Sequence, residues 1–119
     1  MTSDQSDFPF VNLNSLRELL SDNEDGINEI LKLVITTIPP ALQELNHLMA
    51  TQQWHHLKTK IHTTKIYYAY VGQNDLTERL SAWEVELASG KGRDCLPLLR
   101  ELEEKSHRII RELEKLIST

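Results

Sequence analysis

Residues 94–119 read DCLPLLRELEEKSHRIIRELEKLIST, and this stretch has the clearest periodicity in the chain. Its apolar side chains recur every three or four residues, which is the spacing of one face of an α-helix. They are Leu98, Leu99, Leu102, Ile109, Leu113 and Leu116, with Glu, Lys and Arg interleaved between them. The stretch therefore predicts a long amphipathic helix that runs almost to the end of the chain.

A second helix is predicted immediately before it, where the same spacing recurs at Leu76, Leu80, Trp83 and Leu87. Asn74 or Asp75 can cap its start, because short polar side chains accept hydrogen bonds from the free N–H groups of a first turn. The helix should stop at Ser89-Gly90-Lys91-Gly92, the only loop with two glycines.

A third helix is predicted to begin near Gln53 and to end near Val71, with Gly72 as its C-terminal cap. Its buried stripe is expected to contain Trp54, Leu57, Ile61, Thr64 and Tyr68.

The segment before it contains two consecutive prolines inside a helical pattern. Ser21 and Glu24 have the S-x-x-E spacing of a capping box at its start. Apolar residues then follow at helical spacing: Ile27, Ile30, Leu31, Val34, Ile38, Leu42, Leu45 and Met49. Pro39 and Pro40 should interrupt the helix, since proline lacks an N–H, yet the apolar phase continues beyond them. We expect one kinked helix here rather than two separate ones.

The N-terminal part of the chain is less regular. Residues 1–7 are polar and are expected to form a flexible lead-in, followed by an apolar anchor at Phe8, Phe10 and Val11. A short helix should come next, capped by Asn12 or Asn14 and ending near Ser21. One side of this helix is expected to carry Leu13, Leu16, Leu19 and Leu20.

With only 4 Gly and 4 Pro in 119 residues, the chain has too few turns for a many-stranded barrel or sandwich. Its length suits one domain, which we place at residues 8–119. The predicted fold is all-α, an antiparallel up-down four-helix bundle with a short additional N-terminal helix.

Composition excludes several classes of function. The net charge of −5 disfavours nucleic acid and anionic membranes as partners. The most apolar window, Leu31 to Leu42, is too short to span a bilayer. Cys95 has no second cysteine to pair with and is expected to be a small core residue, and no signal sequence opens the chain. These features predict a cytoplasmic protein.

The histidines are the candidates for chemistry at neutral pH: His47, His55, His56, His62 and His107. None has a metal-binding arrangement such as H-E-x-x-H, so no metal is expected. His62 differs because Lys58 and Lys65 lie one turn away on the same side of the helix. Two ammonium groups favour neutral imidazole and attract a phosphoryl group, which points to a nucleophile that accepts phosphate. The simplest alternative is a surface histidine on a helix that also carries lysines.

These residues resemble the histidine phosphotransfer (HPt) domains of multistep phosphorelays. His62-Thr63-Thr64-Lys65 matches the H-x-x-K part of the family pattern, and Gly72, Leu76 and Glu84 fall at its later positions. The kinked helix, the short opening helix and the long closing helix also match. The resemblance thus covers nearly the whole chain from about Phe8.

The resemblance implies a phosphocarrier without kinase activity of its own. His62 would take the phosphoryl group from an aspartyl phosphate on a receiver domain of a response regulator or hybrid sensor histidine kinase. A second receiver would then remove it. No cofactor is expected on this chain, because the receiver supplies Mg²⁺. Lys65 would stabilise the phosphoryl charge with support from Lys58. Glu84 would pair with a helix neighbour, a structural role rather than a catalytic one.

The residues implied in partner binding are Thr63, Ile66, Tyr67, Tyr70 and Gly72, on a chain expected to be monomeric and free-standing. Ile66 stands where the family usually has glycine, which makes the helix surface bulkier. That substitution favours an alternative, a docking module that binds a receiver or partner helix without accepting phosphate. A helical dimerisation domain is a third option.

Overall fold

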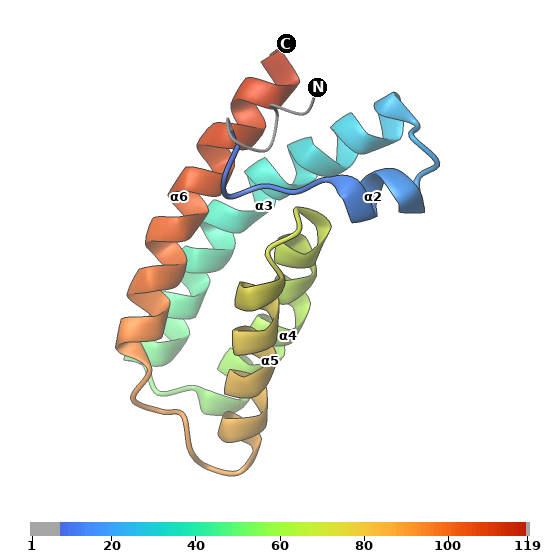
Figure 1. Cartoon of the computed structure of the whole chain (residues 1–119). Helices are drawn as coiled ribbons and strands as arrows, with labels where there is room; N and C mark the ends of the chain where they lie inside the picture. Colours follow the sequence, from blue (N-terminus) through green and yellow to red (C-terminus); the bar gives the residue numbers. More distant parts are fainter. Residues whose placement is uncertain (1–7, 119) are drawn as a thin grey trace.

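The structure, a computed structural model, describes residues 8–118, and the expected lead-in at residues 1–7 lies outside this range. The described backbone forms helices and no strand (Figure 1). The helices are α2 (Asn14–Leu19), α3 (Glu24–Ala50), α4 (Trp54–Tyr70), α5 (Asn74–Ala88) and α6 (Leu96–Ser118). The predicted all-α fold class is confirmed. No helix in this part of the chain is both long and apolar enough to cross a membrane.

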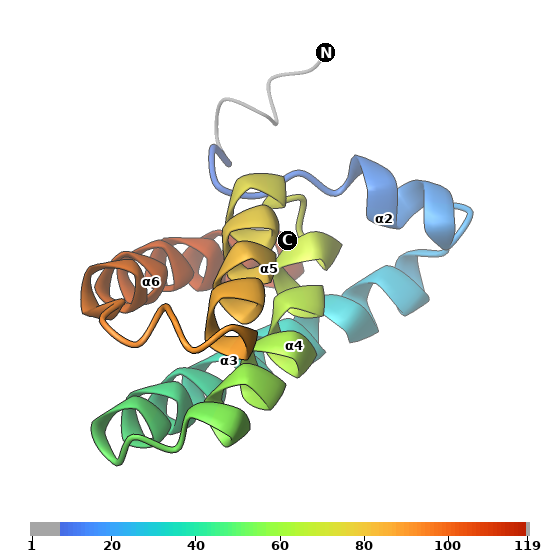
Figure 2. The same cartoon turned by 90° about the horizontal axis from the view of Figure 1, so that it is seen from below.

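The four long helices pack side by side into an elongated body of 47 × 22 × 22 Å. α4 packs against α5, and α3 packs against both α4 and α6; the view from below shows α3 running beneath the other long helices (Figure 2). The predicted stripes of α4 and α5 face one core: Leu57, Ile61, Thr64, Tyr68, Leu76, Leu80, Trp83 and Leu87 are all buried. Trp54 is partly buried at the edge of this core.

Polar atoms inside the core have partners. The Tyr68 hydroxyl lies 2.7 Å from the Ser106 hydroxyl of α6, and burial raises the pKa of the Tyr68 phenol. The Trp83 indole N–H donates to the backbone carbonyl of Gly92 at 2.8 Å. These bonds link α4 to α6 and α5 to the following loop. Cys95, half-buried, packs against the core, and burial there raises the pKa of its thiol.

α3 is one continuous helix that contains Pro39 and Pro40. The helical spacing of apolar residues, which continues beyond the prolines, therefore predicted correctly that the helix is not divided in two. Because proline has no N–H, the backbone carbonyls of Ile35 and Thr36 lose their usual helical donors. Packing compensates for these two lost hydrogen bonds, since Ile38, Ala41 and Leu42 around the prolines are buried.

Several predicted helix caps are wrong. The N-cap of α3 is Asn23, whose side chain accepts from the Gly26 N–H at 3.1 Å, and not Ser21 of the expected capping box. Ser21 instead takes a positive φ of 52° in the turn that precedes α3. α5 is preceded by Gln73, with no side-chain cap, rather than by Asn74 or Asp75.

The start of α2 also departs from expectation. Its N-cap position is Leu13, and the Asn12 side chain accepts from the Asn14 N–H at 3.0 Å. Only Leu16 of the short helix is fully buried, whereas Leu19 is 70% exposed. A helix of only six residues on the outside of the bundle cannot bury all four leucines.

Residues 8–13, here called the N-terminal strap, run across the turn between α4 and α5 (Figure 1). The Asn12 N–H donates to the Val71 carbonyl at 2.8 Å, and the Gln73 side chain donates to the Phe10 carbonyl at 2.7 Å. Glu112 of α6 accepts from the Phe10 N–H at 3.0 Å, and burial raises the pKa of this carboxyl. The strap thus joins α6 to the C-terminal end of α4, and Val11 is buried as predicted.

Candidate functional site

His62 lies in the middle of α4 with its side chain 67% exposed. The buried positions of this helix are Leu57, Ile61, Thr64 and Tyr68, so the position after Ile61 turns away from the core. The periodicity that forms the core therefore also exposes the imidazole.

Glu84 of α5 holds one nitrogen of this imidazole. Its Oε1 lies 2.8 Å from His62 Nδ1, and its side chain is only 15% exposed. An ionised carboxylate can only accept a hydrogen bond, so Nδ1 carries the proton in this contact. In the neutral ring the lone pair then belongs to Nε2, which bonds to no described residue.

Lys65 completes the cluster from the next turn of α4. Its Nζ lies 2.6 Å from Glu84 Oε2 and donates to the Ser81 hydroxyl at 3.0 Å. From the sequence, this ammonium group was predicted to lie beside the imidazole with its charge available to a phosphoryl group. The structure instead pairs it with the carboxylate that holds the imidazole, so Glu84 is bound through both oxygens.

Lys58 lies one turn before His62 and is half-buried. Among the ion pairs of residues 8–118 there is none that includes Lys58. Of the two lysines selected from the sequence, Lys58 is therefore the one whose charge is not neutralised by a carboxylate.

The residues implied in partner binding follow His62 along α4. The Ile66 side chain is 48% exposed, one turn after the histidine. Tyr67 and Tyr70 are half-buried, with ring centroids 6.1 Å apart in an edge-to-face arrangement. Thr63 is exposed, and its hydroxyl donates to the Lys60 carbonyl at 3.1 Å. This half of α4 thus presents an apolar and aromatic surface.

Gly72 has a packing role inside the chain. Its φ is +80°, and a Cβ at this position would lie 2.3 Å from the Asn12 carbonyl oxygen. The residue therefore allows the N-terminal strap to pass over the end of α4. Its role in partner binding stays a prediction.

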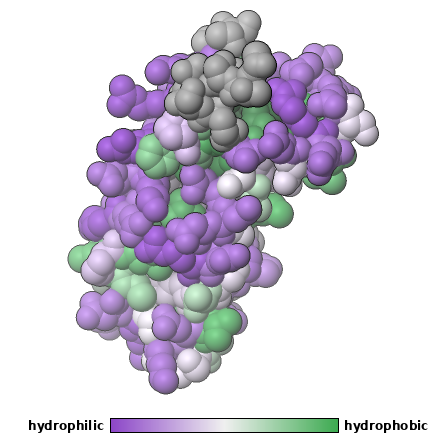
Figure 3. All heavy atoms as spheres, in the orientation of Figure 1, coloured by the Kyte–Doolittle hydropathy of each residue, from purple (hydrophilic) through white to green (hydrophobic). Residues whose placement is uncertain are grey.

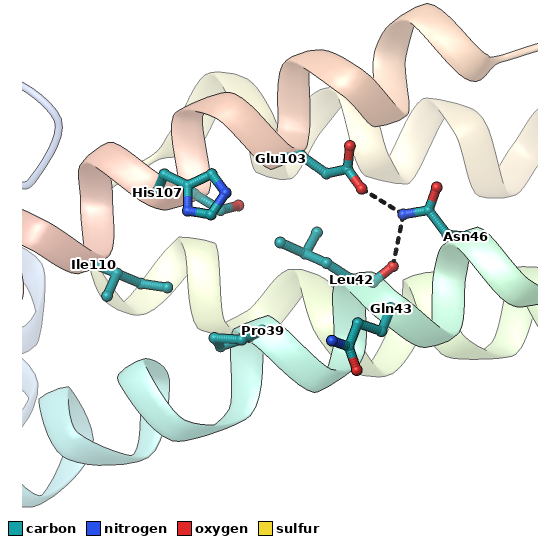
Figure 4. Close-up of a pocket in the computed structure, with 8 residues that line it drawn as sticks. Pro39, Leu42, Gln43, Asn46, Glu103, His107 and Ile110 are labelled. Atoms are coloured by element: carbon teal, nitrogen blue, oxygen red, sulfur yellow. Dashed lines mark hydrogen bonds between the residues drawn. The ribbon is translucent and has the colours of Figure 1, made fainter.

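Among residues 8–118, no other histidine ring is held by a carboxylate. Within the described residues, no group of three or more His, Cys, Asp or Glu side chains could hold a metal ion. A groove of about 540 Å³ lies between α3 and α6, with His107 on one wall and Pro39 and Gln43 on the other (Figure 4). Across it, the Asn46 side chain donates to Glu103, but no carboxylate holds the His107 ring.

Comparison with known proteins identifies no relative: no protein-family model, curated protein or solved structure matches this chain. The candidate site is therefore defined by its own geometry. Sequence reasoning singled out His62, Lys65 and Glu84 but missed Ser81. The available signal was that Ser81 and Glu84 are three residues apart, which places both on one face of α5.

Proposed function

We propose that this chain is a phosphorelay intermediate of the HPt type, an antiparallel up-down four-helix bundle that carries a phosphoryl group on His62. The group would come from an aspartyl phosphate on one receiver domain and pass to another receiver. The observation that carries the proposal is the exposed imidazole whose Nδ1 is held by Glu84, since this leaves Nε2 as the nucleophile.

The transfer step follows from that arrangement. The Nε2 lone pair attacks phosphorus, the bond from phosphorus to the aspartyl oxygen breaks, and the carboxylate leaves with the bonding electrons. The ring then carries a proton on Nδ1 and phosphorus on Nε2, so it gains positive charge. Glu84 lies 2.8 Å from Nδ1 and stabilises that charge without reorganising. Mg²⁺ on the receiver would offset the charge of the phosphoryl oxygens.

The two lysines take different roles in this account. Lys65 bonds to Glu84 and Ser81, so it fixes the carboxylate that orients His62. Lys58 has no carboxylate partner among residues 8–118 and lies one turn from His62, where it can approach the phosphoryl oxygens. The spacing of the two lysines in the sequence predicted a phosphate-binding role for both and an orienting role for neither.

The proposal assigns the chain no kinase activity and no cofactor of its own. Its partners would be response-regulator receivers and a hybrid sensor histidine kinase, and it would act in the cytoplasm as a monomer. Figure 3 is in keeping with a monomer, because the apolar residues on that face form separate patches within a mostly polar surface. Sedimentation at micromolar concentration tests this part of the proposal.

The direct test is transfer of labelled phosphate from a phosphorylated receiver in the presence of Mg²⁺. We expect label on the wild-type chain that is stable in base and labile in acid, and none on His62→Gln with its fold retained. His107→Gln is the matched control, since it removes a histidine from α6, and it should keep full labelling. Undiminished labelling of His62→Gln would contradict the proposal.

A second candidate function is supported by Ile66. This exposed apolar side chain, one turn from His62, keeps a partner from approaching the helix backbone closely. The alternative is a module that docks a receiver or partner helix without accepting phosphate. Receiver binding without any labelling, and unaffected by His62→Gln, would decide for it.

A further inference from the structure

The carboxylate of Glu84 has two opposite effects on the proposed nucleophile. It accepts the Nδ1 proton of His62 at 2.8 Å and so leaves the lone pair on Nε2. A negative charge this close also favours the imidazolium form of the ring, because a nearby opposite charge stabilises the protonated state. An imidazolium has no lone pair with which to attack phosphorus. The site therefore needs a positive charge that offsets Glu84 and leaves it in contact with Nδ1.

Lys65 is placed to supply that charge. Its Nζ lies 2.6 Å from Glu84 Oε2, whereas the imidazole contacts the other oxygen, Oε1. Oε2 is buried from solvent, so an ammonium group rather than water neutralises it. The side chains of Lys65 and Glu84 are only 24% and 15% exposed, and burial of this kind strengthens an electrostatic interaction.

Ser81 anchors this ammonium group on the α5 side of the site. Lys65 Nζ donates to the Ser81 hydroxyl at 3.0 Å, and Ser81 lies one turn before Glu84 on α5. A lysine side chain is a flexible stem that would otherwise extend into solvent, where salt screens its charge. The hydroxyl therefore favours the conformation in which Lys65 stays on the carboxylate.

Few other charges act on this imidazole. Those that face it are Lys58 and Lys65 of its own helix and Glu84 of α5. α4 contains no Asp or Glu, so the carboxylates at its two edges come from its neighbours. That of α3 is Glu44, which pairs with Lys60 at 3.1 Å on the opposite edge of α4. α6 meets α4 in the core, at the buried hydroxyl pair described above.

We propose that Ser81 is a positioning residue, which keeps the Lys65 ammonium group on Glu84 so that the carboxylate orients His62 and leaves it neutral. The inference rests on the proposed function in taking His62 as the phosphate acceptor, whereas the effect on the ring does not require transfer. Loss of the Ser81 hydroxyl frees Lys65, leaves more of the Glu84 charge without compensation and favours imidazolium. Ser81 bonds to Lys65 and not to the imidazole, so it acts through the lysine.

The first test follows the His62 ring by ¹⁵N NMR during a pH titration of the whole labelled chain. Lys65→Met should raise the titration midpoint of this ring by about one pH unit, because the carboxylate is no longer offset. Ser81→Ala should raise it by about half a unit, since Lys65 loses one hydrogen bond and keeps its ion pair. Ser81→Thr retains a hydroxyl and should restore the wild-type midpoint. Ser89→Ala, the control, removes a hydroxyl of α5 that bonds to Glu86, and it should cause no shift.

A combined variant shows whether Ser81 acts through Lys65. In the Lys65→Met background, Ser81→Ala should cause no further shift of the midpoint. The proposal is overturned if Ser81→Ala causes no shift in the otherwise wild-type chain, or if it causes the same shift in both backgrounds. Lys65→Gln is a second lysine variant, should Lys65→Met fail to fold, and it should give the same shift.

The second test separates this inference from the proposed function. The rate of labelling by a phosphorylated receiver is measured against pH for the wild type, Ser81→Ala and Ser81→Thr. Ser81→Ala should move the acid limb of the profile to higher pH by about half a unit, and Ser81→Thr should return it. A rate lowered equally at every pH would indicate a structural effect and overturn the proposal.

The two ideas fail in different ways. If the ring midpoints shift as expected but the wild type accepts no label, the proposed function is wrong and the positioning role stands. If His62 accepts label but Ser81→Ala matches the wild type in both midpoint and pH profile, the positioning role is wrong.

Discussion

The half-buried carboxylate of Glu84 determines which ring nitrogen of the exposed His62 carries the proton. We expect Glu84→Gln to slow phosphoryl transfer about 10- to 100-fold, the effect of losing a charge-assisted hydrogen bond. An amide cannot stabilise the positive ring as a carboxylate does. Transfer rate at saturating receiver measures the effect, and ¹⁵N NMR of the imidazole reports the tautomer. Glu86→Gln, on the same helix without a bond to His62, is the control.

An unchanged transfer rate in Glu84→Gln, with the Nε2 lone pair still favoured, would show that the carboxylate has no part in the chemistry.

Gly72 lies where the N-terminal strap crosses closely over the end of α4. Gly72→Ala should destabilise the fold by more than about 2 kcal/mol, because the added Cβ meets the Asn12 carbonyl as well as taking an unfavourable φ. Gly90 has a similar φ of +82° but open space around it, so Gly90→Ala should cost only about 1 kcal/mol. Urea denaturation measures both. Equal losses would mean that the strap contact contributes nothing.

Prediction from the sequence was strongest where a residue's role depends on its own helix. The exposure of His62 and the burial of Tyr68 followed from helical periodicity alone. The bond from Lys65 to Glu84 did not, because it depends on how α4 and α5 pack. The helix caps were predicted wrongly for a related reason. Ser21, Asp22 and Asn23 all have side chains that can cap a helix, and which of them does so depends on where the preceding turn ends.

At the scale of the element, α3 tolerates two prolines in its interior. Pro40 is exposed, so replacing it removes no core contact. Pro40→Ala should stabilise the protein by about 1–2 kcal/mol, because the gain in helix propensity exceeds the loss of rigidity in the unfolded chain. Pro97→Ala is the control, since Pro97 lies in the first turn of α6 where no N–H is needed, and it should give no gain.

Thermal unfolding followed by circular dichroism measures both proline variants. A loss of stability in Pro40→Ala would mean that the shape imposed by the prolines is itself required for packing.

An ion pair that links α5 to α6 responds to pH. Glu101 accepts from both terminal nitrogens of Arg79, at 2.8 and 2.9 Å, and lies 2.9 Å from Lys105. The Arg79 hydrogen bonds, followed by those of Lys105, lower the pKa of Glu101 from 4.5 to about 2. Because the pKa of Glu101 is lower in the folded than in the unfolded chain, the ion pair stabilises the fold at pH values above the ordinary pKa. This stability is lost as the pH falls toward the lowered pKa.

We therefore expect the wild type to lose stability between about pH 4.5 and about pH 2 more steeply than Glu101→Gln does. Glu104→Gln, a neighbouring exposed residue on α6, should keep the wild-type slope. Melting temperatures across this range measure the effect. Parallel curves for the wild type and Glu101→Gln would contradict the assigned ion pair.

For the molecule as a whole, the distribution of charge separates the cationic α4 from the acidic remainder. Amino-acid composition revealed only the net charge of −5. The structure adds that Lys60 pairs with Glu44 of α3 on one edge of α4, whereas Lys65 pairs with Glu84 of α5 beside the exposed imidazole on the other edge. The N-terminal strap crosses the C-terminal end of this helix. The packing of the helices thus pairs two of the three lysines of α4 with carboxylates and leaves the His62 side chain exposed.

The most direct test of the account is the position of the phosphoryl group on the ring. After transfer from a phosphorylated receiver, ¹H–¹⁵N correlation spectra of the imidazole and ³¹P NMR distinguish phosphate on Nε2 from phosphate on Nδ1. The account predicts phosphate on Nε2 of His62, with the proton kept on Nδ1 beside Glu84. Phosphate on Nδ1, or on any residue other than His62, would contradict it.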